Sequence, residues 1–290
     1  MTQPWLGLTL VFATFGVLLA IFTVIGHLLH PEVLRKGLHV SLGLTALSFP
    51  WLFDDVWPVM LLGAGSIGGF VGVRVGLPVL RRLAHSLAGI TRVSLGEFCF
   101  ITATCIVFLI AKNDPVLYSI PMLVLALADA AAALVGTAYG RHRYQTWDDY
   151  KTLEGSAAFF VVATACIYFP LAFFTEASPA QSAAVAVLVA LATTVLEASM
   201  GRGFDNLLVP LGALAAIKAT GLTENRPGAL ETGSPVVAAA LSLLIALLVL
   251  LLAGLASWTR ANPSRQGPPI PDEVTRAALR SAQARSRSRS

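Results

Sequence analysis

The chain has 290 residues, of which 56% are hydrophobic and 12% charged, with a net charge of +4 and a mean hydropathy of +0.75. A soluble domain carries about 25% charged residues, so this composition excludes an ordinary water-soluble protein and predicts an integral membrane protein. The positive charge does not indicate nucleic-acid binding, because the basic residues fall between apolar segments and in the tail, where membrane topology explains them. Three cysteines within apolar segments exclude a disulfide framework and a zinc site.

Apolar stretches of roughly 20 residues recur along most of the chain, a length typical of transmembrane helices rather than of barrel strands. We therefore predict an all-α fold, a polytopic transmembrane helix bundle of about nine spans, with residues 1–258 as its catalytic domain. The arginine-rich residues 259–290 are expected to form a disordered cytoplasmic tail. The predicted spans are 5–29, 37–53, 57–77, 97–111, 115–139, 156–174, 180–199, 204–220 and 235–258.

Lysine and arginine gather in alternate connections between these spans and in the tail. The positive-inside rule then predicts an N-terminus outside and a C-terminus in the cytoplasm. With this orientation, the residues that belong to the cytoplasmic half are Arg35, Lys36, His39, Glu97, Arg141, Lys151, Glu154, Glu197, Asp205 and Asn206. We expect a multi-pass membrane protein whose active site lies on the cytoplasmic face.

The first connection, between spans one and two, contains Arg35 and Lys36, and His39 lies one turn inside span two. A lysine at this depth is ordinarily an interfacial anchor that snorkels. His39 fits two interpretations, a donor to a phosphate group or a buried imidazole that is satisfied by a neighbour.

Gly63–Gly68, in span three, matches the pattern G-x-G-x-x-G. The segment follows no predicted strand and opens no βαβ unit, so it does not indicate dinucleotide binding. The chain also contains no P-loop and no protein-kinase signature. Any nucleotide must therefore bind by other means.

Asp129 is a carboxylate inside the apolar fifth span, which ends in small residues. Burying an ionisable group at membrane depth costs free energy, so the first hypothesis is that Asp129 belongs to a functional site. The expected role of its carboxylate is to bind a divalent cation. Asp129, Ala133, Gly136 and Gly140 share one helical face at i, i+4, i+7 and i+11. The alternative interpretation is a helix-packing seam in which a neighbour hydrogen-bonds to the aspartate.

A basic loop follows, with Arg141, Arg143 and Lys151 ahead of Glu154 and Ser156. Three cations at this spacing suit a triphosphate, and Glu154 could complete a metal site. The alternative makes the cations topology anchors, Glu154 a solvated carboxylate and Ser156 an N-cap.

A second acidic group comprises Glu197, within the membrane by the predicted boundaries, and Asp205 with Asn206 after a tight turn. Asp205 and Asn206 would cap span eight in the simpler interpretation. Their location on the same face as Asp129 instead suggests shared coordination of one Mg²⁺–nucleotide.

Taken together, these residues resemble the polyprenol kinase family of membrane enzymes, which includes phytol kinases, dolichol kinases and CTP-dependent diacylglycerol kinases. The resemblance covers most of residues 35–218 and leaves out the C-terminal span and tail. One departure is Ala128, where many members have glycine before the aspartate. The matching segments are RKGLH at Arg35–His39, ADAAAALVGTAYGRHR at Ala128–Arg143, KTLEGSAA at Lys151–Ala158, and Glu197 followed by DNLLVP at Asp205–Pro210.

The resemblance implies transfer of a phosphoryl group from a nucleoside triphosphate, typically CTP, to a lipid alcohol. Such a transfer requires mainly a metal, cationic clamps and positioning. We expect Asp129, Glu197 and Asp205 to hold Mg²⁺, and Asp129, Lys151, Glu154 and His39 to act in catalysis. The expected nucleotide-binding residues are Arg35, Lys36, Gly136, Gly140, Arg141, Arg143, Lys151 and Asn206.

Two other functions use the same charges. A cytidylyltransferase would make a CDP-lipid from CTP, and a cation-coupled transporter would use Asp129 and Glu197 within the membrane. The overall resemblance favours a prenyl alcohol such as phytol as the acceptor.

Overall fold

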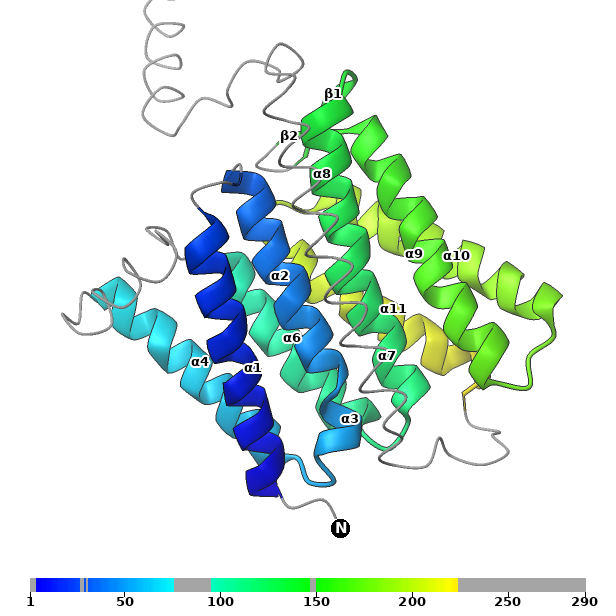
Figure 1. Cartoon of the computed structure of the whole chain (residues 1–290). Coiled ribbons are helices and arrows are strands. Elements are labelled where there is room, and N and C mark those ends of the chain that lie inside the picture. Colours follow the sequence, from blue (N-terminus) through cyan, green and yellow to red (C-terminus); the bar gives the residue numbers. More distant parts are fainter. Residues whose placement is uncertain (1–3, 27–28, 30, 76–94, 147–149, 224–290) are drawn as a thin grey trace, which may run out of the picture.

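The computed structural model describes residues 4–26, 29, 31–75, 95–146 and 150–223, and this part of the chain is mostly helical, as predicted. The helices run side by side, with α4 and α1 at one edge of the bundle and α9 and α10 at the other (Figure 1). The predicted ninth span, 235–258, and the predicted tail, 259–290, lie outside the described residues. The helices are α1 Pro4–Ile25, α2 Pro31–Leu47, α3 Phe49–Leu52, α4 Trp57–Val75, α6 Leu95–Ala111, α7 Pro115–Leu123, η2 Val124–Ala128, α8 Asp129–Tyr139, α9 Leu153–Phe174, α10 Pro179–Ser199 and α11 Asp205–Thr220.

Four helical segments in the described residues are long and apolar enough to cross a membrane, namely Pro4–Ile25, Pro115–Tyr139, Leu153–Phe174 and Pro179–Ser199. Each remaining predicted span before residue 224 also overlaps a helix. The count of nine spans and the orientation of the termini stay predictions.

The segment Pro115–Tyr139 is the central helix, since 56% of its apolar window is buried, against 22–33% for the other three. It begins at a cap in which Asp114 Oδ1 accepts a hydrogen bond from the Leu117 amide at 2.8 Å. Its middle is a π-helical segment, η2, which ends directly before Asp129. Single π-helical turns inside α-helices occur frequently at functional sites.

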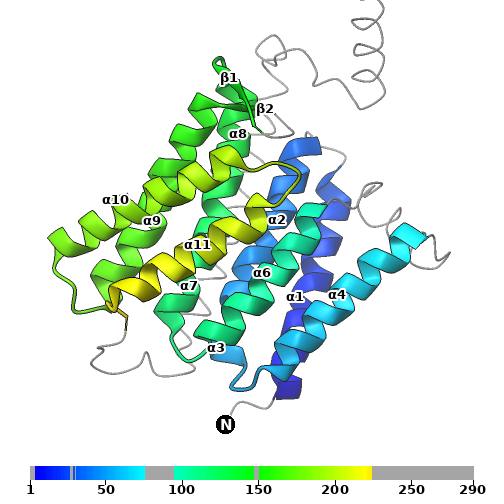
Figure 2. The same cartoon turned by 180° about the vertical axis from the view of Figure 1, so that it is seen from behind.

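The loop between α8 and α9 contains a short β-hairpin, which the sequence interpretation did not predict. Strand β1, Arg143–Gln145, pairs antiparallel with β2, Tyr150–Thr152, and Tyr144 lies opposite Lys151. The hairpin projects from the same end of the bundle as the connection between α10 and α11 (Figure 2). Thr152 caps α9 by accepting a hydrogen bond from the Gly155 amide at 3.1 Å, so the hairpin runs directly into that helix.

Helices α8 and α9 approach each other closely at glycines. A Cβ atom at Gly155 would lie 2.8 Å from the carbonyl oxygen of Ala132, and one at Gly136 would lie 2.8 Å from Thr152 Oγ1. Because the Ala132 carbonyl oxygen is a backbone atom that cannot move away as a flexible side chain does, Gly155 is required for this close contact between α9 and α8. Thr152, the last residue of β2, therefore has a defined place beside Gly136 of α8.

Candidate active site

Helix α2 presents Lys36, His39 and Gly43 on one face, at i, i+3 and i+7. Gly43 lies against η2, where a Cβ atom would come within 2.6 Å of the Ala126 Cβ. This close approach brings Lys36 Nζ to 2.5 Å from Asp129 Oδ2. Lys36 is 5% and Asp129 9% exposed, so the aspartate points into the bundle rather than at lipid, and Lys36 is no snorkelling anchor.

His39 fits the second of its two predicted environments, a buried imidazole with partners. Its Nε2 lies 3.1 Å from the carbonyl oxygen of Leu125 in η2 and 3.4 Å from Asp129 Oδ2. A carbonyl oxygen only accepts, so Nε2 carries the hydrogen and donates it. The ring also packs edge-on against Phe100, with centroids 4.8 Å apart. Nδ1 is then the nitrogen that can accept a proton.

Lys151, on strand β2, contacts two carboxylates that come from helices α10 and α11. Its Nζ donates to Glu197 Oε1 at 2.7 Å, to Asp205 Oδ2 at 3.1 Å and to the Glu197 carbonyl oxygen. Burial by itself would lower the pKa of this lysine, but the charges of Glu197 and Asp205 outweigh it and raise the pKa above its ordinary value. Lys151 is therefore a cation at physiological pH.

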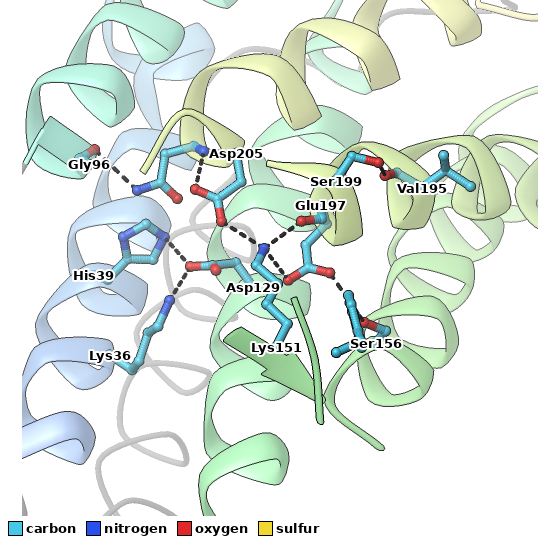
Figure 3. Close-up of polar contacts among 12 residues, drawn as sticks. Lys36, His39, Gly96, Asp129, Lys151, Ser156, Val195, Glu197, Ser199 and Asp205 are labelled. Carbon is cyan, nitrogen blue, oxygen red and sulfur yellow. Dashed lines mark hydrogen bonds and ion pairs between the residues drawn. The ribbon is translucent and has the colours of Figure 1, made fainter. Parts of the chain in front are cut away.

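These two groups lie next to each other and form one charged cluster, comprising Lys36, Asp129, Lys151, Glu197 and Asp205 (Figure 3). Its members come from α2, α8, β2, α10 and α11. The structure thus brings together three carboxylates that are separated by up to 76 positions in the chain. Glu197 is only 5% exposed, so the cluster lies inside the protein and not on its surface.

The cluster fits a hard divalent cation by its donor chemistry, because Mg²⁺ prefers carboxylate oxygens. Glu197 and Asp205 already converge on one positively charged atom, Lys151 Nζ. Within the described residues, no three His, Cys, Asp or Glu side chains are grouped closely enough to hold a metal ion as they stand. Lys151 Nζ lies between Glu197 and Asp205, and Lys36 Nζ pairs with Asp129. Metal ligation by Asp129, Glu197 and Asp205 therefore stays a prediction.

The start of α11 is fixed to α6, which places Asp205. Gly203 has a φ of +87° and packs on Gly96, where a Cβ atom would lie 2.5 Å from the Gly96 amide nitrogen. Asn206 Nδ2 donates to the Gly96 carbonyl oxygen at 3.1 Å. Neither Asp205 nor Asn206 is the N-cap of α11, since that position is Phe204. Asn206 thus positions the helix end that carries Asp205.

Several predicted residues lie outside the charged cluster. Arg141 and Arg143 are exposed, and Arg35 binds Glu32 at 2.6 Å on the surface. Glu154 accepts a hydrogen bond from the His142 Nδ1 at 2.7 Å instead of joining Asp129. Gly136 and Gly140 both pack against Thr152, which gives them a structural place between α8 and the hairpin. Their predicted contacts with a nucleotide stay predictions.

Two polar residues at the cluster had no functional place in the sequence interpretation. Ser156, considered there only as an N-cap, lies with Oγ 3.5 Å from Glu197 Oε2, while Thr152 is the actual cap. The phenol oxygen of Tyr144 lies 2.6 Å from the same Ser156 oxygen, within hydrogen-bond distance. The hairpin is the feature that would have indicated Tyr144, because strand pairing places this residue beside Lys151. The 16 residues 140–155 between two predicted spans do not by themselves reveal that pairing.

The chain is similar to a curated phytol kinase from Synechocystis sp., with 32% identity over 184 residues. The aligned part covers 63% of this chain and 76% of the relative. No protein-family model matches the chain. No solved structure matches it significantly.

Proposed function

This chain belongs to the polyprenol kinase family, and from that premise we propose that it is an integral-membrane lipid kinase. It transfers a phosphoryl group from CTP to the hydroxyl of a prenyl alcohol such as phytol. The observation that carries the proposal is the charged cluster, in which lysines and carboxylates from five elements meet inside an apolar bundle (Figure 3). Buried charges of this kind in a membrane protein mark a functional site.

In the proposed complex, Asp129, Glu197 and Asp205 would hold the magnesium ion of the nucleotide. That ion, when bound, neutralises charge on the triphosphate. Lys151, which stays protonated, moves from Glu197 and Asp205 to the phosphates and stabilises charge there. The position between Glu197 and Asp205 already accommodates one cation, Lys151 Nζ, and this supports a magnesium ion at that position once the lysine has moved to the phosphates.

The acceptor alcohol enters between helices, with its apolar tail in lipid and its hydroxyl near Asp129. His39 supports this placement, because Nε2 is engaged by Leu125 and Asp129 and Nδ1 remains as a base for the hydroxyl proton. The exposed Arg141 and Arg143 attract the nucleotide from the cytoplasm. CTP as the donor follows from the family resemblance.

The test is an assay with purified protein, CTP labelled at the γ-phosphate, Mg²⁺ and a panel of lipid alcohols that includes phytol, geranylgeraniol, a long polyprenol and diacylglycerol. We expect label on phytol, and more from CTP than from ATP. In a parallel assay with CTP labelled at the α-phosphate, label on the lipid would instead identify a cytidylyltransferase. If no alcohol is labelled and the protein in liposomes carries out cation-coupled uptake without nucleotide, the kinase proposal is wrong.

A further inference from the structure

Glu197 has two differently engaged oxygen atoms. Oε1 accepts a hydrogen bond from Lys151 at 2.7 Å, whereas Oε2 lies 3.5 Å from the hydroxyl oxygen of Ser156 (Figure 3). The carboxylate is 5% exposed, so water does not freely satisfy the second oxygen. The orientation of the Glu197 carboxylate therefore depends on the hydrogen bond between Ser156 Oγ and Oε2.

Ser156 is in turn engaged by a residue of the hairpin. Its Oγ lies 2.6 Å from the phenol oxygen of Tyr144. Tyr144 stands directly opposite Lys151 in the strand register, and opposite residues of an antiparallel pair project from the same face. The hairpin thus delivers two side chains to Glu197, namely the lysine directly and the tyrosine through Ser156.

The hydrogen-bond direction follows from the chemistry of the three groups. An ionised carboxylate only accepts, so Ser156 donates its single hydrogen to Glu197 and must accept from Tyr144. Burial raises the pKa of Tyr144 above its ordinary value, which agrees with a neutral phenol that keeps its hydrogen. The chain of donors therefore runs from Tyr144 through Ser156 to Glu197.

We propose that Tyr144 and Ser156 are positioning residues that orient the Glu197 carboxylate toward Lys151 and the magnesium–nucleotide, a role that rests on the proposed kinase function. Neither residue touches the reacting phosphate. Residues that hold a metal-binding carboxylate in place typically contribute 10- to 100-fold to metal affinity or activity. Loss of either hydroxyl should therefore weaken the use of Mg²⁺ more than the use of the alcohol.

The first measurement requires no catalysis. Thermal unfolding of the full-length protein in detergent is followed for Tyr144→Phe, Ser156→Ala and the double variant. We expect the double variant to lose about as much stability as Ser156→Ala alone, because the two hydroxyls act in series. In a Glu197→Gln background the loss caused by Ser156→Ala should shrink. Losses that simply add in both tests would overturn the proposed chain.

The second measurement uses the kinase assay. Ser156→Ala and Tyr144→Phe should raise the Mg²⁺ concentration for half-maximal rate and lower kcat about tenfold, with the KM for the alcohol within about twofold of wild type. Ser156→Thr keeps the hydroxyl and should restore the Mg²⁺ dependence. Matched controls are Tyr168→Phe at the other end of α9, and Ser119→Ala, whose hydroxyl bonds the Pro115 carbonyl of its own helix.

The outcomes separate the two proposals. A wild-type protein that phosphorylates no alcohol overturns the kinase function, while the unfolding tests still decide whether Tyr144 and Ser156 hold Glu197. An active wild type whose Ser156→Ala variant shows unchanged Mg²⁺ dependence overturns the positioning role alone. An equal effect of the control variants would also overturn it, because the effect would then not belong to Glu197.

Discussion

Asp129 shows how one buried charge is stabilised in the apolar bundle. Its carboxylate is held by Lys36 at 2.5 Å and lies 3.4 Å from His39. A buried pair of this kind contributes little net stability compared with an apolar pair, but the loss of one partner leaves an uncompensated charge. Stability and activity at Asp129 can therefore be separated by changing one partner or both.

We predict that Asp129→Asn lowers the rate of lipid phosphorylation at least tenfold, or about 1.4 kcal/mol of barrier. It should also destabilise the protein by about 3–5 kcal/mol, because Lys36 remains buried without its counter-charge. The double variant Lys36→Met/Asp129→Leu should recover most of the melting temperature and none of the activity. Recovery of activity in the double variant would show that Asp129 serves packing alone.

The raised pKa of Lys151 predicts a pH dependence of stability. A lysine whose pKa is raised by folding stabilises the protein fully below its ordinary pKa of about 10.4, and this contribution is lost as the pH rises through the folded value. The difference in melting temperature between wild type and Lys151→Met should thus stay constant from pH 7 to pH 9 and shrink above about 10.4. A difference that shrinks already at pH 8 contradicts the charged state of Lys151.

At the scale of elements, glycines decide how closely the helices of the site approach. Gly43 lets α2 lie against η2, and without this contact Lys36 and His39 would lie farther from Asp129. Gly65 on α4 is also a helical glycine, but a Cβ atom there meets nothing within 4 Å. The two positions form a matched pair, because the same substitution changes packing at one and only helix propensity at the other.

We predict that Gly43→Ala lowers the stability by about 1–3 kcal/mol through overpacking and reduces kinase activity. Gly65→Ala should raise the stability by up to about 1 kcal/mol, since alanine favours the helix over glycine. Thermal unfolding and the labelled-CTP assay measure both effects. Equal behaviour of the two variants would mean that the contact between α2 and η2 does not limit the site.

For the whole molecule, the arrangement of the charges suggests a direction across the membrane. The hairpin lies at one end of the bundle (Figure 1), where it carries Lys151 of the charged cluster and the exposed Arg143, and the exposed Arg141 comes two residues before it. Lys112, with its ammonium on the Asp54 carbonyl oxygen at 2.8 Å, lies at the other end, between α6 and α7. The positive-inside rule assigns the first end to the cytoplasm.

We predict that single cysteines report this orientation in a protein whose native Cys99, Cys105 and Cys166 are replaced by alanine. Asn113→Cys should react with a membrane-impermeant maleimide in intact cells, because it is expected outside. Gln145→Cys, exposed on the hairpin, should react only after the membrane is permeabilised. The reverse labelling pattern would place the active site outside the cell and contradict a cytosolic nucleotide.

The sequence by itself determined the class of fold and the candidate residues. Apolar spans, the carboxylates Asp129 and Glu197 at membrane depth and a basic loop follow from composition and spacing, which depend on local physics. Asp129, Lys151, Glu197 and Asp205 could thus be named before any contact was known. Their family resemblance agrees with the similarity to a phytol kinase.

Only the tertiary structure decided which of these residues meet. Lys36 and Asp129 are 93 positions apart in the chain. They meet where Gly43 of α2 packs against the π-helical segment that ends before Asp129. The placement of Glu154 on His142 instead of in the cluster, and the line from Tyr144 through Ser156 to Glu197, depend on a hairpin register. Such contacts arise between distant segments, so residue type and spacing along the chain do not specify them.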